Sequence, residues 1–324
     1  MKMIGWTVFT GWMVSVLSAA VLAQSYPGKP LRFIVPFAPG GGIDIVSRAI
    51  APQLQAGLGQ PVLVENRPAS AGILGADAVA KSAPDGYTIM PGGSWMVVGS
   101  LMYKSLPYSV LRDFTPIALI ADASIQIMIH ASLPAKNFAE FIEYAKANPG
   151  KLNFGSAGIG HPFHLTMEMF KQRTGTNMVH VPYKGMNPAV QDFITGRIQV
   201  LSYSANAQLT ELIKAGKLRA IATATEQRLP ALPEVPTMDE LGIRNFHPAA
   251  NLSIVGPAGI PRPVVDRLHA ELVKATATPE VAKTYASLLF LRTLGTPDEY
   301  GKIMRNELDT WGPLIKALNI SLDQ

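Results

Sequence analysis

The 324-residue sequence contains no cysteine and few charged side chains. The absence of cysteine excludes a disulfide framework, thiolate metal ligands, a cysteine nucleophile and a lipid-anchored cysteine. Only 16% of the residues are charged and 48% are hydrophobic, so the composition favours a folded globular protein over a disordered one. The net charge of +5 is spread along the chain, and we therefore expect no nucleic-acid partner.

Several motifs of catalysis and cofactor binding are also missing. The chain has no G-x-x-x-x-G-K-[ST], no complete G-x-G-x-x-G and no H-E-x-x-H. Ser94 and Ser156 both lie in glycine-rich loops, but neither has both flanking glycines of the G-x-S-x-G nucleophile elbow, since Met96 follows Ser94 and Phe154 precedes Ser156 where glycine is needed. We expect no cofactor, no metal and no enzymatic activity, with an exported serine hydrolase as a remote alternative.

Residues 1–23 resemble a secretory signal peptide. Lys2 carries the only charge, an apolar stretch follows, and Val21-Leu22-Ala23 fits the small-residue pattern before a cleavage point. A retained membrane anchor is the alternative, because the 20 residues Ile4–Ala23 are long enough to span a bilayer. Their Gly, Ser and Thr content disfavours an anchor, so we expect cleavage near Ala23 and export to the periplasm.

The rest of the chain alternates short apolar runs with helical patterns, which predicts α/β layers. A strand pattern covers residues 31–35, 62–65, 87–90, 152–154, 179–181, 198–201 and 218–223, and a helix pattern covers 43–55, 72–81, 137–148 and a segment from about 162. The last part is mainly helical, with capping boxes at Thr237–Glu240 and Thr296–Glu299. We expect the chain to cross between two lobes near Ile120–Ile129 and to return through the Pro-rich stretch Arg228–Pro236.

Two glycine-rich loops carry the clearest chemical signal. Residues 36–44 (PFAPGGGID) and 153–161 (NFGSAGIGH) each join an expected strand to an expected helix, and residues 91–95 (PGGSW) form a weaker third loop. Glycine lets backbone N–H groups approach a ligand, and the helix start adds unpaired N–H groups and a positive dipole end, which together suit an anion. A tight turn would explain any one loop equally well. Such loops gather at the carboxyl ends of strands, so we expect them to face a shared cleft that binds a small carboxylate.

Individual residues near these loops each allow two interpretations. Asp44 falls in the first helical turn, where ordering of the loop is favoured over contact with a ligand ammonium group. His161 either donates a hydrogen bond to the ligand or is a solvated surface residue. His164 and Glu168 share a helix face, and we expect a structural hydrogen bond between them rather than a metal site. Trp95 either stacks on a flat substrate or belongs to the core.

The remaining candidates are polar residues at strand ends. Ser94 could donate to an anion. We favour the backbone and hydroxyl of Tyr183 over Lys184, because lysine is usually solvated. A Ser156–His164 dyad is the arrangement a hydrolase would need, but a helix N-terminus is a poor place for a histidine that must become cationic.

The first loop resembles the signature P-F-x-P-G-G-x-x-D-x-x-A-R of the Bug, or TctC-type, receptors, which are extracytoplasmic solute-binding proteins of the tripartite tricarboxylate transporter family. Residues 36–48 (PFAPGGGIDIVSR) match it, with Ser47 in place of alanine. Similar motifs follow along nearly the whole mature chain at 66–68 (NRP), 84–88 (PDGYT), 155–160 (GSAGIG), 164–165 (HL), 181–185 (VPYKG) and 232–237 (LPEVPT). His161 departs from the family's frequent serine, and Asn251 and Ser253 depart from a frequent tryptophan and glycine, so no particular ligand is implied.

The resemblance implies a two-lobed periplasmic-binding-protein fold, type II-like, with a ligand cleft between lobes joined by hinge strands. We place lobe 1 at 24–124 and 240–324 and lobe 2 at 125–239. The resemblance implies a receptor for carboxylates as a class, including amino acids, di- and tricarboxylates and aromatic acids. We expect a monomer that captures a di- or aromatic carboxylate and delivers it to membrane permease subunits; a periplasmic sensing partner is the alternative. The expected ligand-binding residues are Pro39, Gly40, Gly41, Gly42, Ile43, Asp44, Ser94, Trp95, Ser156, Ala157, Gly158, Gly160, His161 and Tyr183.

Overall fold

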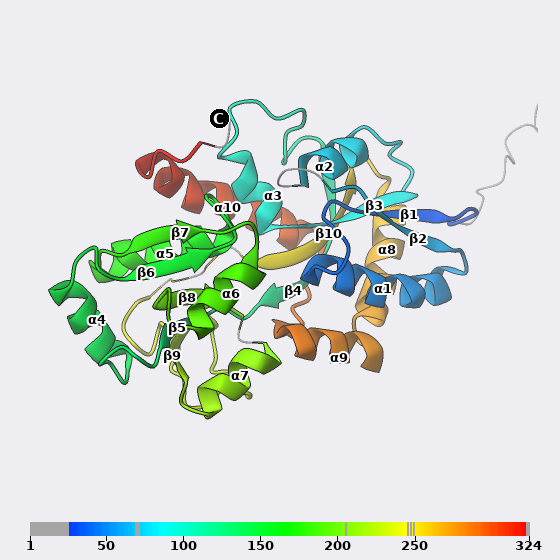
Figure 1. Cartoon of the computed structure of the whole chain (residues 1–324). Coiled ribbons are helices and arrows are strands. Elements are labelled where there is room, and N and C mark those ends of the chain that lie inside the picture. The colour runs from blue at the N-terminus through cyan, green and yellow to red at the C-terminus, as the bar shows by residue number, and fades with distance from the viewer. Residues whose placement is uncertain are drawn as a thin grey trace, which may run out of the picture.

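The computed structural model describes residues 26–68, 72–204, 206–244, 246, 248 and 250–321, and the expected signal peptide at 1–23 lies outside these ranges. The described chain folds into two halves that lie side by side, each built on one β-sheet (Figure 1). Among the helices described, none is both long enough and apolar enough to cross a membrane.

The first sheet has six strands in the order β11-β4-β10-β3-β1-β2. β1 runs parallel to β2 and β3, whereas β10 is antiparallel to β3 and β4. Leu31 and Phe33 of β1 pack in one core cluster and Ile34 packs in another, so both faces of the strand are buried, which explains its continuous apolar run. The strands are β1 (Leu31–Val35), β2 (Val62–Asn66), β3 (Thr88–Gly93), β4 (Phe114–Ala123), β10 (Asn251–Pro257) and β11 (Phe290–Leu291).

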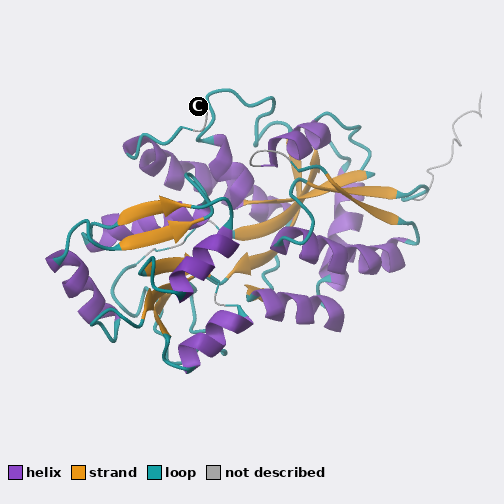
Figure 2. Ribbon diagram, viewed as in Figure 1, coloured by secondary structure: helices purple, strands orange, loops and turns teal. Residues whose placement is uncertain are grey.

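Six helices cover this sheet (Figure 2). α1 packs on α8 and α9 over one face. α2, α3 and the first half of α10 contribute to the cluster that includes Ile34. The helices are α1 (Gly42–Leu58), α2 (Ile73–Ala80), α3 (Ser94–Ser100), α8 (Arg262–Ala275), α9 (Pro279–Leu288) and α10 (Pro297–Ala317).

The second sheet has five strands in the order β7-β6-β8-β5-β9, with β6 parallel to β7 and β8, and β5 antiparallel to β8 and β9. α4 and α5 pack in one core cluster and α6 and α7 in another. The elements are β5 (Gln126–His130), α4 (Phe138–Ala147), β6 (Asn153–Ser156), α5 (Pro162–Thr174), β7 (Val179–Pro182), α6 (Met186–Ile194), β8 (Val200–Tyr203), α7 (Ala207–Lys214) and β9 (Leu218–Thr223).

The chain crosses between the sheets at two places. β4 of the first sheet and β5 of the second are separated only by Ser124 and Ile125, which confirms the crossing expected near Ile120–Ile129. The expected return through Arg228–Pro236 is wrong. There, two successive turns, closed by the bonds from Leu232 N–H to the Leu229 carbonyl and from Val235 N–H to the Leu232 carbonyl, bury these three side chains in the second sheet's core. The chain reaches β10 only later.

The long C-terminal helix α10 joins the two halves. Tyr300 and Met304 pack in a first-sheet cluster, whereas Trp311 and Ile315 pack with α5 residues in a second-sheet cluster. The capping box of Thr296 and Glu299 begins this helix, as expected. The reciprocal bonds of Thr237 and Glu240 also form, but they close a turn rather than open a helix.

Candidate ligand-binding site

A cavity of about 700 Å³ lies between the two halves of the molecule. The first-sheet half contributes the start of α1, the β3–α3 junction, β10 and the end of α9 with β11. The second-sheet half contributes the start of α5, the start of α6 with the segment before it, and the end of β8. Of the residues predicted from sequence, those that line the cavity are Gly40, Gly41, Gly42, Ile43, Ser94, Trp95 and His161.

Asp44 orders the first glycine loop without lining the cavity. Its carboxylate accepts hydrogen bonds from the backbone N–H of Gly40 at 2.9 Å, from Asn66 Nδ2 at 2.8 Å and from Arg48 Nε at 3.0 Å. Burial acts to raise the pKa of Asp44, but these hydrogen bonds outweigh it and hold the pKa below its usual value. The geometry therefore fits the ordering role favoured from sequence.

The start of α1 remains available to an anion. Gly41 is the N-cap residue and no side chain caps the helix there. An uncapped helix start leaves first-turn N–H groups that a ligand can satisfy, and it carries the positive end of the dipole. Gly40 has a φ of +84°, a conformation that residues with a Cβ seldom adopt, so the turn into the helix depends on glycine.

The second glycine loop is arranged differently from the prediction. Ser156 is fully buried, and its Oγ lies 2.9 Å from the carbonyl of Gly158 and 2.7 Å from Nε2 of His180. Ser156, Ala157, Gly158 and Gly160 are not among the cavity-lining residues, and neither is Pro39 of the first loop. The Ser156 hydroxyl faces inward because it closes the turn at Gly158, so it is a loop-forming group rather than a ligand contact in this structure.

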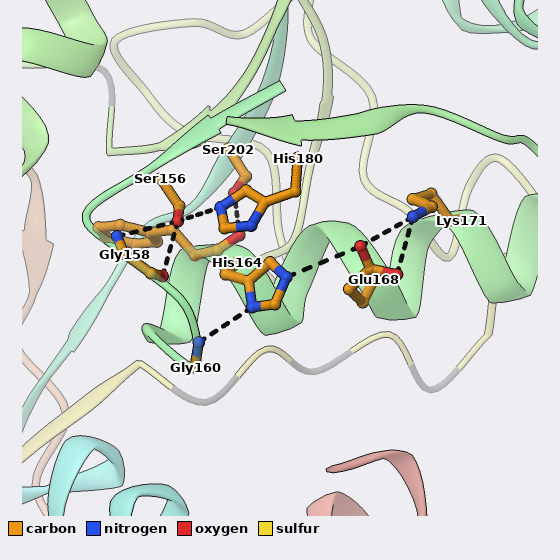
Figure 3. Close-up of polar contacts among 9 residues, drawn as sticks. Ser156, Gly158, Gly160, His164, Glu168, Lys171, His180 and Ser202 are labelled. Atoms are coloured by element: carbon orange, nitrogen blue, oxygen red, sulfur yellow. Dashed lines mark hydrogen bonds and ion pairs between the residues drawn. The ribbon is translucent and has the colours of Figure 1, made fainter. Parts of the chain in front are cut away.

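The rings of His164 and His180 lie beside this loop, His180 next to Ser156 and His164 next to Gly160 (Figure 3). His164 Nδ1 accepts the N–H of Gly160 at 3.0 Å, and the rings of His164 and His180 stack with centroids 3.9 Å apart. Burial, with nearby positive charge adding to its effect, lowers the pKa of His164 to about 3 and that of His180 to about 4. Both rings are neutral at pH 7.

The expected hydrogen bond between His164 and Glu168 is wrong. His164 Nε2 lies 3.8 Å from Glu168 Oε1, which is too far for a hydrogen bond, and Glu168 instead pairs with Lys171 at 2.8 Å. The hydrolase dyad is wrong as well, since Ser156 bonds to His180 rather than His164. Within the described ranges no group of His, Asp and Glu side chains is placed to hold a metal ion.

His161 is the part of this loop that reaches the cavity. It is the N-cap residue of α5, and its Nδ1 accepts the N–H of Phe163 at 3.3 Å. Burial lowers its pKa to about 4, so the ring is neutral at pH 7. Because Nδ1 accepts, the proton resides on Nε2, which leaves one N–H donor for a ligand oxygen.

Tyr183 and Lys184 differ in their position relative to the cavity. The Tyr183 hydroxyl donates to Asp192 at 2.8 Å and its ring lies against Gly155, so it does not line the cavity. Lys184 does line it, and it is exposed. Among the described residues of the lining, Lys184 is the only lysine or arginine, and no aspartate or glutamate is present.

The third loop places Ser94 and Trp95 in the cavity wall. Ser94 is fully buried, and its Oγ accepts the N–H of Asn251 at 3.0 Å and donates to Glu307 on α10. Trp95 packs edge-on against Phe37, with ring centroids 4.9 Å apart. Trp95 therefore serves both as a cavity wall and as a core residue.

Sequence reasoning missed several lining residues. Ser204 is 6% exposed and its Oγ has no hydrogen-bond partner among the residues described. It directly follows β8, so the rule that ligands gather at the carboxyl ends of strands could have found it. The other missed residues are Ile45, Ala123, Pro162, Phe163, Gly185, Met186, Asn187, Pro188, Tyr203, Ala250, Leu252, Leu288 and Phe290.

Comparison with known proteins identifies the family. The sequence model "Tripartite tricarboxylate transporter family receptor" (TctC) matches residues 46–320. The chain belongs to the TctC family. A relative, protein BugT of Bordetella pertussis, is 34% identical over 308 residues, covering 94% of each chain.

Solved structures of TctC-type proteins agree. The periplasmic binding protein BugD is 32% identical, with a TM-score of 0.75 over 91% of this chain and 99% of BugD. MatC of Rhodopseudomonas palustris, solved with bound malate, is 28% identical, with a TM-score of 0.73 over 90% and 100%. A second R. palustris protein, solved with adipate, is 29% identical, with a TM-score of 0.77 over 91% and 99%. The TctC chain thus has the expected two-lobed α/β periplasmic-binding-protein fold and is a solute-binding receptor rather than an enzyme.

Proposed function

We propose that this receptor captures a small carboxylate in the cavity between its two lobes. The observation that carries the proposal is the electrostatic character of the lining: an uncapped helix start at Gly41, the ammonium group of Lys184, and no described carboxylate on the wall. Relatives with malate and adipate bound support a dicarboxylate. A volume of about 700 Å³ also accommodates an aromatic acid.

The mechanism is capture without chemistry. One ligand carboxylate docks on the N–H groups at the start of α1, and His161 Nε2–H and Lys184 approach from the other half. Phe163, Met186 and Phe290 give the same cavity an apolar wall for a methylene chain or ring. Closure of the lobes is favoured only by the contacts that the closed state adds, so the ligand must touch both halves.

The wider setting is part of the proposal. We propose that residues 1–23 direct export and are cleaved near Ala23, and that the mature monomer works in the periplasm. We further propose lobes at 24–124 with 240–324 and at 125–239, with the end of α10 packing across onto the second lobe. Membrane permease subunits of the tripartite type then bind the closed, ligand-loaded receptor. Binding of the loaded receptor to a sensor instead of a permease would favour the sensing alternative.

A thermal-shift screen of residues 24–324 tests the proposal. The panel contains mono-, di- and tricarboxylates, amino acids and aromatic acids, together with the neutral amides of the same shapes. A ligand at 100 times its Kd adds about 2.7 kcal/mol to the free energy of unfolding. We expect a shift with at least one acid and none with its amide; equal shifts with both would contradict an anion site.

A matched pair of lysine variants locates the site. Lys184→Met removes the ammonium group in the cavity lining and should weaken carboxylate binding about tenfold. Lys283→Met removes an exposed ammonium group on α9, outside the cavity, and should leave affinity unchanged. Equal affinities for the two variants would show that the acid binds elsewhere.

A further inference from the structure

Behind the cavity wall, the carboxyl group of Glu307 on α10 is held by two residues that line the cavity. Ser94 Oγ–H donates to Glu307 Oε1 at 2.5 Å, and Asn251 Nδ2–H donates to the same oxygen at 2.7 Å. Ser94 Oγ in turn accepts the backbone N–H of Asn251 at 3.0 Å. The three residues form a closed ring, so Glu307 is one hydrogen bond away from the ligand cavity.

The second carboxyl oxygen of Glu307 has no partner. Oε2 is shielded from solvent and, among the residues that the structure describes, makes no hydrogen bond. The same holds for Asn251 Oδ1, which can only accept. An ionised carboxylate here is a charge with one shielded oxygen left unsatisfied, which is costly, and protonation of Oε2 removes that charge.

The charges around Glu307 favour the protonated form. In the described chain no lysine, arginine or histidine forms an ion pair with it. Asp122 of β4 and Tyr300 of α10 are the titratable groups that act electrostatically with it, while α3 and β10 present the neutral Ser94 and Asn251. Burial, with Asp122 adding, raises the pKa of Glu307 to about 7 against the opposing hydrogen bonds.

We propose that Glu307 takes up a proton when a carboxylate enters the cavity, so that the receptor binds its ligand together with one proton. This inference rests on the proposed function. A ligand anion in the cavity repels an ionised Glu307 through a buried, weakly screened region, and protonation removes that repulsion. Oε1 continues to accept from Ser94 and Asn251 in either form, so the cavity wall keeps its geometry while its charge changes.

The coupling has a defined pH signature. Uptake of one proton on binding makes Kd rise with pH, approaching about tenfold per pH unit above a pH of about 7. Well below pH 6, Glu307 is already protonated in the free receptor and contributes no further change. A receptor without this coupling has a flat profile over the same range for a ligand that is fully ionised throughout.

Calorimetry with adipate and with malate tests the proposal directly. The binding enthalpy is measured at pH 7.5 in two buffers of different ionisation enthalpy, which gives the number of protons taken up. We expect uptake of well over half a proton for the wild type, but less than one, because Glu307 with a pKa of about 7 is already partly protonated in the free receptor. We expect none for Glu307→Gln, whose amide copies the uncharged acid and whose Kd should not vary from pH 6 to 8.5. Asp309→Asn removes an exposed carboxylate of the same helix and should behave as the wild type.

Other outcomes overturn the proposal. Wild-type binding without proton uptake would show that no group takes up a proton. Proton uptake that persists in Glu307→Gln and disappears in Asp122→Asn or His161→Gln would assign the proton to that other residue. If Glu307→Gln does not fold, infrared difference spectra of the wild type replace it: ligand addition must strengthen a protonated-carboxyl band. If neither these acids nor any acid of the wider panel binds, the proposed function itself fails, which is distinct from binding without a proton.

Discussion

The imidazole of His164 fixes the backbone of Gly160: its Nδ1 accepts the glycine N–H at 3.0 Å, across one turn at the start of α5. The loop that carries His161 into the ligand cavity is thus fastened by a side chain of the helix that follows it. The bond requires an unprotonated Nδ1, and burial keeps the pKa of His164 at about 3. The shape of the second glycine loop therefore depends on a neutral, buried histidine.

Replacing His164 tests this dependence. His164→Leu removes the acceptor and leaves the Gly160 N–H buried without a partner, which should lower the free energy of unfolding by about 1–3 kcal/mol and weaken ligand binding. His164→Asn offers Oδ1 as a substitute acceptor and should recover part of both. Urea unfolding and calorimetric Kd values measure the two effects, and identical behaviour of the Leu and Asn variants would exclude the hydrogen bond as the cause.

Acid should destabilise the protein through its histidines. The pKa values of His161, His164 and His180 are lowered to about 4, 3 and 4, mainly by burial. The unfolded chain takes up protons near pH 6.5 while the folded chain resists them, so stability is complete above that pH and is lost as the pH falls toward 4. We expect a slope approaching about 1.4 kcal/mol per pH unit for each histidine, seen in urea unfolding between pH 4 and 7.

A variant isolates this contribution. His164→Gln with His180→Gln removes two of the three groups and should flatten the profile between pH 4 and 6.5, at some cost in stability at pH 7. His130→Gln serves as the control, because His130 is only partly buried and bonds to Ser132 at the surface. A profile that is as steep in the double variant as in the wild type would place the acid sensitivity in the carboxylates.

Much of the fold could be predicted because local sequence and tertiary packing agree. β1 is an unbroken apolar run because both of its faces are buried, and α4 begins at the N-cap residue Asn137, as its sequence pattern indicates. β4 and β10 were not predicted. Their pairing with each other, and that of β10 with β3, joins segments more than 100 residues apart, and no local pattern records such a partner.

The site was predictable at the level of loops and not at the level of side chains. The rule for strand ends found the loops at Gly40–Gly42, Ser94 and His161, which all reach the cavity. It could not predict that the Ser156 hydroxyl points inward and bonds to His180. Nor could it predict that the Tyr183 hydroxyl donates to Asp192, whereas Lys184 lines the cavity. Those outcomes depend on hydrogen bonds between segments that only the folded chain brings together.

Two glycines close to Ser94 should respond oppositely to alanine. Gly93 has a φ of +143°, and a Cβ there would lie 2.3 Å from the backbone oxygen of Asn251. Gly93→Ala should therefore destabilise the protein by several kcal/mol and disturb the Ser94–Asn251 contact. Gly99, inside α3, has open space around its Cβ position, so Gly99→Ala should add about 0.5–1 kcal/mol. Thermal and urea unfolding compare the two, and a stable Gly93→Ala variant would contradict this backbone arrangement.

Asp44 should act on ligand binding without touching the ligand. Asp44→Asn removes the charge that accepts from Gly40, Asn66 and Arg48, and should cost about 1.5–3 kcal/mol of stability, since hydrogen bonds to a buried charged group are stronger than neutral ones. Loosening Gly40 misaligns the N–H groups at the start of α1, so Kd for a carboxylate should rise at least several-fold.

Asp266→Asn is the control. It breaks an exposed ion pair with Arg262 on α8 and should change the free energy of unfolding by less than about 1 kcal/mol and leave Kd unchanged. Because hydrogen bonds depress the pKa of Asp44, its contribution should be present near neutrality and fade as the pH falls below the ordinary carboxyl range. Wild-type affinity in Asp44→Asn, with the predicted loss of stability, would mean that the helix start binds its anion without help from this carboxylate.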